Sequence, residues 1–166
     1  MCDDRLVAPG TNMAIVGRIV TPHGERWAAW TDRGLVAVGA RRAEVVTTAR
    51  ALGLRESDGP DGATVLTEVD WRAMPGGFRG RVLKACTRIP AGQVVTYADL
   101  AHAAGSAGAA RAVGSAMAAN PVPVIIPCHR VIRADGWLGA YSAGGTAMKA
   151  RMLRAESVAV YGDRIG

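Results

Sequence analysis

Cysteine is scarce in this chain of 166 residues, which has only Cys2, Cys86 and Cys128. An odd number at such wide spacing fits neither a disulfide framework nor a zinc motif, so we expect reduced thiols. Long apolar runs are missing too, since no stretch approaches the roughly 18 residues of a membrane span. The first ten residues are acidic and lack the basic and then apolar order of a signal peptide. We therefore expect a cytoplasmic protein with no membrane partner.

Acidic side chains are few in the second half of the chain. Residues 1–75 hold nine arginines and ten acids, a net charge of −1, whereas residues 76–166 hold eleven Lys and Arg and four acids, a net charge of +7. This uneven distribution, more than the total of +6, indicates a surface for a polyanion such as nucleic acid. An ordinary solvated surface in an arginine-rich protein is the alternative that charge alone leaves open.

The first half of the chain predicts a small antiparallel sheet followed by a helix. Residues 13–40 contain three apolar runs separated by turn signals, the pattern of a meander. Apolar residues at helical spacing predict a helix over 43–54. We expect residues 55–63 to be a polar connector and residues 64–71 to return as a strand. A domain boundary at Met74–Gly77 then separates an N-terminal domain, residues 1–75, from a C-terminal domain, residues 76–166.

The second half predicts a mostly helical domain, so the chain as a whole is expected to have an α+β fold. Apolar spacing predicts a helix over 77–89, with Cys86 on its buried face as a core thiol. A last helix is predicted over 144–157, with Thr146 at its cap and its methionines facing inward.

The middle of this domain has the helix-turn-helix pattern. Residues 95–105 predict a short helix with Thr96 as N-cap, and residues 107–120 predict a second helix after a glycine-bearing turn. Arg111 is the only charged side chain in 103–128, and helices that read base edges carry more polar groups, so we expect no sequence-specific readout. Close approach to a minor groove with one inserted arginine is one interpretation. A small-residue helix packed inside the protein is the other.

The segment 122–127, VPVIIP, predicts a short buried strand that ends at Cys128. In a strand, adjacent side chains point to opposite faces, so Cys128 and His129 can interact only if the backbone turns or a water bridges them. Nearby cations or a base lower the pKa of a thiol, and His129, Arg130 and Arg133 are candidates. An inert cysteine beside a structural histidine is the alternative. Nothing around this segment resembles a thiol protease.

Four motifs together closely resemble those of the O6-alkylguanine-DNA alkyltransferases, or methylated-DNA–protein-cysteine methyltransferases. The motifs are IPAGQVVTYADLA (89–101), AARAVGSAMAANPVPVI (109–125), IPCHRVI (126–132) and GWLGAYS (136–142). The resemblance implies DNA repair by direct reversal: each molecule moves one alkyl group from O6 of guanine, or O4 of thymine, in duplex DNA to its own cysteine. It also implies that no metal or organic cofactor takes part.

The resemblance also assigns catalytic roles. Cys128 matches the nucleophile and alkyl acceptor, and His129 matches the histidine that helps to deprotonate it through a water. Glu156 matches the acid that orients this histidine. Asn120 matches the residue that shapes the turn carrying the cysteine.

Further residues match the groups that bind DNA and the target base. Tyr97 and Arg111 match the pair that extrudes the damaged nucleotide from the duplex. The small residues that fall where the family lays its helix along the minor groove are Ala110, Ala112 and Gly114. The residues that match the base pocket are Tyr97, Val131 through its backbone carbonyl, Tyr141 and Ser142.

The chain also departs from the family. Arg79 and Leu83 stand where members often have Gln and Trp, and the glycine loop after Tyr141 is one residue longer through Ala143. The zinc site of some relatives is not expected here, because the sequence around Cys2 and His23 does not have a zinc-ligand pattern.

Two other functions compete with repair. A protein that binds the lesion without repairing it would resemble relatives that replace the acceptor cysteine, which this chain retains. A transcription regulator would bind with strong sequence dependence. We instead expect a monomer that binds duplex DNA through the minor groove, with little dependence on sequence and a strong dependence on salt.

Overall fold

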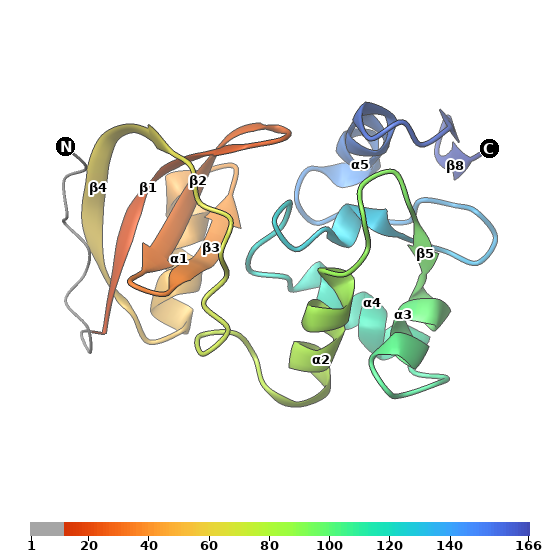
Figure 1. Ribbon diagram of the computed structural model, residues 1–166, viewed down its shortest axis with the longest axis horizontal. Helices are drawn as coiled ribbons and strands as arrows, with labels where there is room; N and C mark the ends of the chain where they lie inside the picture. The colour runs from red at the N-terminus through yellow and green to blue at the C-terminus, as the bar shows by residue number, and fades with distance from the viewer. Residues whose placement is uncertain (1–11) are drawn as a thin grey trace. The chain divides into compact units, whose positions relative to one another are not determined.

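The computed structural model describes residues 12–166, and the chain divides into two compact units between Met74 and Pro75 (Figure 1). It is a mixture of helices and strands, so the predicted α+β class is confirmed. No helix among the described residues is both long enough and apolar enough to cross a membrane. Cys2 and the acidic start lie outside the described residues.

From residue 12 onward, the first unit is a four-stranded sheet with one helix. Its strands are β1 (Met13–Thr21), β2 (Gly24–Thr31), β3 (Gly34–Gly39) and β4 (Arg55–Thr64). The order is β3-β2-β1-β4, with β1 antiparallel to β2 and parallel to β4. Helix α1 (Arg42–Ala51) connects β3 to β4 and buries Val45, Val46 and Ala49. The predicted meander and the predicted helix are therefore confirmed.

Two other predictions for this unit are wrong. Residues 55–63, expected as a connector, form most of β4, whereas of the expected strand over 64–71 only Thr64 belongs to β4 and Val69 forms an isolated bridge. Because β4 pairs on one side only, it is an edge strand and tolerates a polar sequence. Its acidic side chains Glu56 and Asp58 also form ion pairs with arginines of α1.

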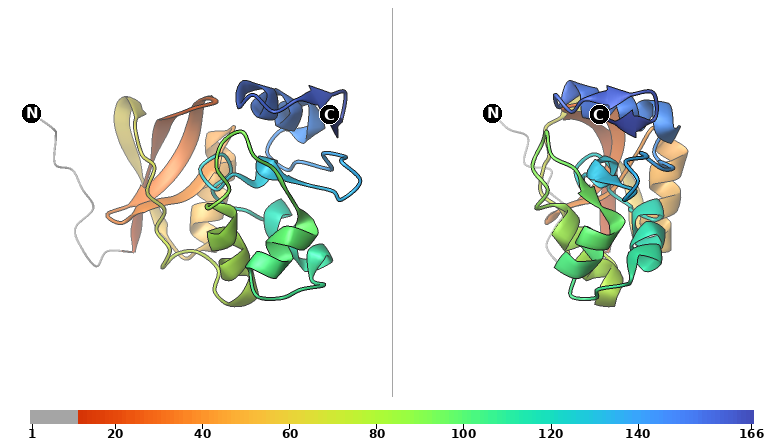
Figure 2. Two further views of the ribbon diagram at one scale, coloured as in Figure 1. Left: turned by 45° about the vertical axis from the view of Figure 1, so that its right-hand side comes forward. Right: turned by 90° about the vertical axis from the view of Figure 1, so that its right-hand side faces the viewer.

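The second unit combines helices with two small sheets. Its elements are α2 (Gly77–Cys86), β5 (Val95–Thr96), α3 (Tyr97–Ala103), α4 (Ala110–Ala118), the 3-10 turn η1 (Cys128–Arg130), β6 (Val131–Ile132), α5 (Gly145–Ala155), β7 (Val160–Tyr161) and β8 (Arg164–Ile165). Within this unit, α2, α3 and α4 lie on one side of η1, and α5 with the β7–β8 hairpin lies on the other (Figures 1 and 2).

The two outer helices of this unit differ in detail from the prediction. Helix α2 ends at Cys86, three residues early, and Cys86 is fully buried as expected. Helix α5 is capped by Gly144 and not by Thr146, because the chain enters the helix at φ 129°, a conformation that glycine adopts without strain. The Thr146 hydroxyl donates to the carbonyl of Gly139 instead, at 3.3 Å.

Helices α3 and α4 occupy the two positions predicted for the helix pair. Thr96 caps α3 as expected: its hydroxyl accepts the Asp99 N–H at 3.1 Å, and the Asp99 carboxylate accepts the Thr96 N–H at 3.0 Å. This reciprocal capping box satisfies two backbone donors that the helix itself cannot pair. It also fixes the point at which β5 turns into the helix that begins with Tyr97.

We expect Thr96→Ala to lower the free energy of unfolding by about 1 kcal/mol, because the Asp99 N–H at the start of α3 loses its partner. Urea unfolding of the full chain measures the change. The matched control is Thr87→Ala. It removes an exposed hydroxyl just after α2 that donates to the Lys84 carbonyl, and it should cost less than about 0.5 kcal/mol. Equal losses in the two variants would contradict the capping role.

Candidate active site

A compact turn, and not a strand, leads to the cysteine. The strand predicted over 122–127 is wrong: these residues form successive turns, with an isolated bridge between Pro123 and Ile126. Proline has no N–H for a strand ladder, and the Ile126 N–H donates back to the carbonyl of Val122 at 2.9 Å. Val124 has φ 76°, which an extended strand does not allow. The strand of this region, β6, comes after the cysteine.

The side chain of Asn120 closes this turn and contacts the sulfur. Its Oδ1 accepts the Val122 N–H at 3.0 Å, and its Nδ2 donates to the Ile126 carbonyl at 3.0 Å. The same Nδ2 lies 3.2 Å from Cys128 Sγ. Asn120 is buried, so each of these bonds replaces one to water. The Asn120 amide therefore closes the turn that leads to Cys128.

The backbone also turns at the cysteine itself. Residues Cys128–Arg130 form one 3-10 turn, held by the Cys128 N–H on the Ile126 carbonyl at 2.8 Å and the Arg130 N–H on the Pro127 carbonyl at 2.9 Å. Cys128 is 4% exposed and His129 is 0% exposed. Adjacent side chains in such a turn are not forced to opposite faces, so the geometric objection to a Cys128–His129 pair does not apply here.

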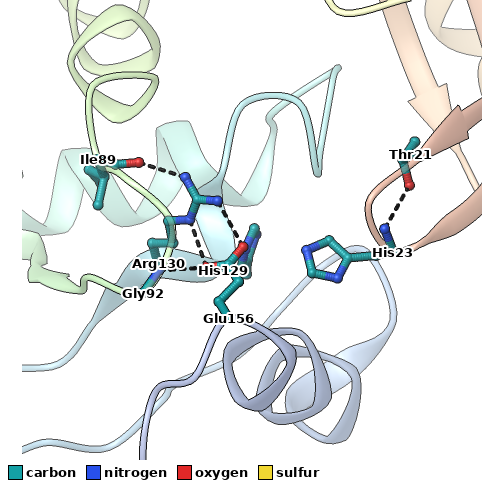
Figure 3. A network of polar contacts seen from close by, with 7 residues as sticks. All are labelled: Thr21, His23, Ile89, Gly92, His129, Arg130 and Glu156. Carbon is teal, nitrogen blue, oxygen red and sulfur yellow. Dashed lines mark hydrogen bonds and ion pairs between the residues drawn. The ribbon is translucent and has the colours of Figure 1, made fainter. Parts of the chain in front are cut away.

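Glu156 joins His129 to Arg130 (Figure 3). His129 Nε2 lies 2.9 Å from Glu156 Oε1, and Arg130 donates to both carboxylate oxygens, from Nε at 2.9 Å and Nη2 at 2.8 Å. Burial raises the pKa of Glu156, but the bonds from Arg130 and His129 outweigh it and hold the pKa at about 2. The acid is therefore an anion at neutral pH. Because Nε2 faces this anion, Nε2 carries the proton of a neutral imidazole, and Nδ1 is then the nitrogen able to accept a further proton.

Arg130 does not have the role considered for it from the sequence. We considered it as a cation beside the thiol, but its guanidinium binds Glu156 and also donates to the Ile89 carbonyl at 2.6 Å. The N–H of Gly92 approaches the same carboxylate at 3.5 Å. Arg130 therefore connects the cysteine turn, the loop after α2 and the end of α5.

The cation that acts on the thiol is Lys149, which the sequence analysis missed. It is 0% exposed and donates from Nζ to the carbonyls of Val131 at 2.7 Å and Leu138 at 2.5 Å. Burial lowers the pKa of Lys149 to about 8, and the nearby Cys128 opposes this shift. One signal in the sequence could have revealed it: Lys149 stands three and four residues before two core positions of α5, so it lies on the buried face.

Opposing effects set the proton affinity of the cysteine. Burial raises the pKa of the Cys128 thiol above its usual value, and the Asn120 hydrogen bond, the charge of Lys149 and a bond from Tyr141 offset part of this rise. Burial raises the pKa of Cys86 too, where no hydrogen bond opposes it. Of the two cysteines in the described chain, Cys128 is thus the one where hydrogen bonds as well as a charge oppose burial, whereas at Cys86 the charge of Arg130 alone does so.

The predicted pocket residues do not all have the same surroundings. Tyr97 is partly buried, with its pKa raised by burial and then by Cys128, and Tyr141 is buried and interacts with the thiol. Val131 is fully buried, with its carbonyl bound to Lys149. Ser142 is exposed. The structure therefore brings Tyr97, Tyr141 and Val131 into one electrostatic environment with the cysteine and leaves Ser142 at its edge.

The small-residue face of α4 lies at the surface. Arg111 and Ala112 are exposed, Ala110 and Gly114 are partly exposed, and a Cβ added to Gly114 would meet no atom within 4 Å. The opposite face buries Val113, Ala116 and Met117 in the unit. The interpretation of a helix packed inside the protein on its small residues is therefore wrong, and an open face with one arginine remains.

Comparison with known proteins identifies a family for most of the second unit. The family described as 6-O-methylguanine DNA methyltransferase, DNA binding domain, matches residues 77–158. The methylated-DNA–protein-cysteine methyltransferase of Mus musculus is 55% identical over 67 residues, 40% of this chain and 32% of that protein. The protein of the same name from Methanothermobacter thermautotrophicus is 44% identical over 86 residues, 52% of this chain and 47% of that protein.

A solved structure resembles both units. It is the crystal structure of Mycobacterium tuberculosis OGT in complex with DNA, with a TM-score of 0.67 and 30% identity, covering 86% of this chain and 93% of that one. The matches to the curated relatives, by contrast, span a third to a half of their length.

We expect Lys149→Met to raise the pKa of the Cys128 thiol, because a buried positive charge is lost. Alkylation of Cys128 by iodoacetamide, followed by mass spectrometry, should slow at pH 7 by about tenfold for each unit of pKa gained. The difference should narrow above pH 8, where native Lys149 itself loses its proton.

Two further variants separate charge from packing. Lys149→Gln keeps donors without the charge and should slow alkylation as the Met variant does. Arg151→Met removes an exposed charge from the same helix and should change nothing. A native rate in Lys149→Gln would contradict the electrostatic role.

Proposed function

The chain belongs to the 6-O-methylguanine DNA methyltransferase family, and from this membership we propose that it repairs alkylated DNA by transferring the alkyl group to its own Cys128. The observation that carries the proposal is the buried thiol held by Asn120 beside a histidine whose Nε2 faces an ionised Glu156. This is the arrangement of an activated nucleophile with an oriented base. The substrate is O6-alkylguanine in duplex DNA, with O4-alkylthymine as a second possible lesion.

The proposed reaction is a single displacement. The thiol proton passes to His129 Nδ1 through a water, and Glu156 stabilises the imidazolium that forms. The sulfur then attacks the alkyl carbon, the S–C bond forms, and the C–O bond breaks with its electron pair remaining on the base. The thioether is not reversed, so each molecule acts once. A displacement at an alkyl carbon by a thiolate requires neither a metal nor an organic cofactor.

DNA binding is assigned to the α3–α4 pair, acting as a helix-turn-helix. We propose that the face of α4 formed by Ala110, Ala112 and Gly114 lies along the minor groove, because only small residues allow such close approach. Tyr97 and Arg111 extrude the damaged nucleotide, the tyrosine by crowding its phosphate and the arginine by filling the gap in the stack. This mode makes few contacts to base edges, so it requires little sequence preference.

The extruded base is proposed to lie against Tyr97, Tyr141 and Ser142 and to bond the carbonyl of Val131. That carbonyl already accepts Lys149 Nζ at 2.7 Å, and a carbonyl oxygen has two lone pairs, so one is left for the base. Lys149 therefore fixes the direction of a group that reads the substrate. We further propose that the protein works as a monomer in the cytoplasm, where the thiol stays reduced.

Incubation with duplex DNA that carries O6-methylguanine, tritium-labelled in its methyl group, should move one labelled methyl group onto each protein molecule. Cys128→Ala should abolish the transfer, whereas Cys86→Ala, the matched loss of a buried thiol, should retain it. Label that stays on DNA while the native protein binds it tightly would contradict repair and indicate a protein that only marks the lesion.

We expect Arg111→Ala to slow transfer from duplex DNA by about tenfold or more, since unstacking a base costs a few kcal/mol that the inserted side chain partly offsets. The rate with free O6-benzylguanine should stay native, because no base has to be extruded. Single-turnover kinetics with both substrates test this. Equal slowing with the two substrates would remove Arg111 from the extrusion step.

A further inference from the structure

The short parallel sheet of the second unit places Arg133 beside Tyr97. In its register Val95 pairs with Val131 and Thr96 with Ile132, so the next residue on each strand is Tyr97 and Arg133. Both therefore leave the sheet at the same edge, and the loop that follows β6 runs next to β5 (Figures 1 and 2). Tyr97 is the residue assigned to the phosphate of the extruded nucleotide.

A glycine confirms that the two side chains converge. A Cβ built on Gly139 would lie 3.6 Å from the Tyr97 hydroxyl oxygen, 3.8 Å from Arg133 Cγ and 3.9 Å from Arg133 Cδ. The methylene groups of Arg133 and the hydroxyl of Tyr97 thus both lie next to the backbone of Gly139, which has no side chain. Its guanidinium extends further outward, and the Arg133 side chain is 61% exposed.

The partner of this guanidinium is a carboxylate that can be exchanged. Arg133 Nη2 donates to Asp135 Oδ2 at 2.9 Å, and both side chains are largely exposed to water. Asp135 Oδ1 accepts the Trp137 N–H at 3.2 Å, and this bond, followed by the one from Arg133, lowers the pKa of Asp135, so the acid is ionised at neutral pH. An exposed pair of this kind contributes little stability, whereas a guanidinium binds a phosphate by two parallel hydrogen bonds.

We propose that Arg133 binds a DNA phosphate next to the extruded nucleotide, and that Asp135 holds the guanidinium in place until the phosphate displaces it. The inference rests on the proposed function and adds a second phosphate contact beside Tyr97. A second cation lies against this loop, because Arg164 of β8 stacks on the ring of Trp137 at 5.1 Å. A polyanion that approaches this edge therefore meets both arginines. Removing Asp135 should therefore strengthen DNA binding, and removing Arg133 should weaken it.

The salt dependence of duplex binding tests the contact. One phosphate contact contributes about 0.9 to the slope of log K against log salt. Between about 50 and 200 mM salt, the affinity of the native protein should therefore fall by a factor about threefold to fourfold larger than the factor for Arg133→Ala. Arg151→Ala removes one exposed charge from α5 and is the matched control. An equal change of slope in both variants would overturn the proposal, because net charge would then explain the effect.

A second pair of variants tests the exchange of partners. Asp135→Asn should tighten duplex binding at low salt by a few-fold, and this gain should vanish in Arg133→Ala/Asp135→Asn, since the freed guanidinium is its source. A gain that survives in the double variant would overturn the role of Arg133.

The free base separates this proposal from the proposed function. All of these variants should react with free O6-benzylguanine at the native rate, because that substrate carries no phosphate. Loss of that reaction in Arg133→Ala would place the residue in the chemistry and not in DNA binding. Absence of the reaction in the native protein would refute the proposed function itself.

Discussion

Asn120 donates one amide proton toward the sulfur of Cys128 and uses the rest of the same amide to close the turn that carries it. The chain needs this arrangement because three prolines around the turn cannot supply backbone donors. The cysteine is thereby held in a buried position, where desolvation disfavours the charged thiolate. Asn120, Lys149 and Tyr141 offset that cost from three different parts of the second unit. The position of the sulfur thus depends on Asn120, and its proton affinity depends on Asn120 together with Lys149 and Tyr141.

The charges around the thiol form two sets that share the segment Cys128–Val131. In the first set, the Glu156 carboxylate binds His129 and Arg130. The bond to Glu156 fixes the orientation of the histidine, while the charge of the arginine balances the charge of the carboxylate. In the second set, Lys149 acts on the thiol and binds the carbonyl of Val131. Both sets thus attach to one short stretch of chain, a 3-10 turn followed by two strand residues. The same strand then delivers Arg133 to the edge proposed to meet DNA.

The sequence predicted what local pattern controls and missed what tertiary pairing controls. The meander, helix α1 and the Thr96 cap follow from periodicity and capping chemistry, the motifs located Cys128 and His129, and the family resemblance located Glu156. Strand β4 was missed because an edge strand that pairs in parallel with a distant segment needs no apolar alternation. The predicted strand before Cys128 was wrong because β-branched residues favour a strand only where prolines do not remove the donors. Lys149 was missed because a charged residue at a core position is rare and its partners are backbone carbonyls.

Intact-mass spectrometry of the native protein after reaction with O6-benzylguanine tests the central claim most directly, because it depends on the chemistry of the site alone. The account predicts the addition of one benzyl group per molecule, located on Cys128 by peptide mapping, with one equivalent of guanine released. A protein of unchanged mass, or a benzyl group on any other residue, would contradict it.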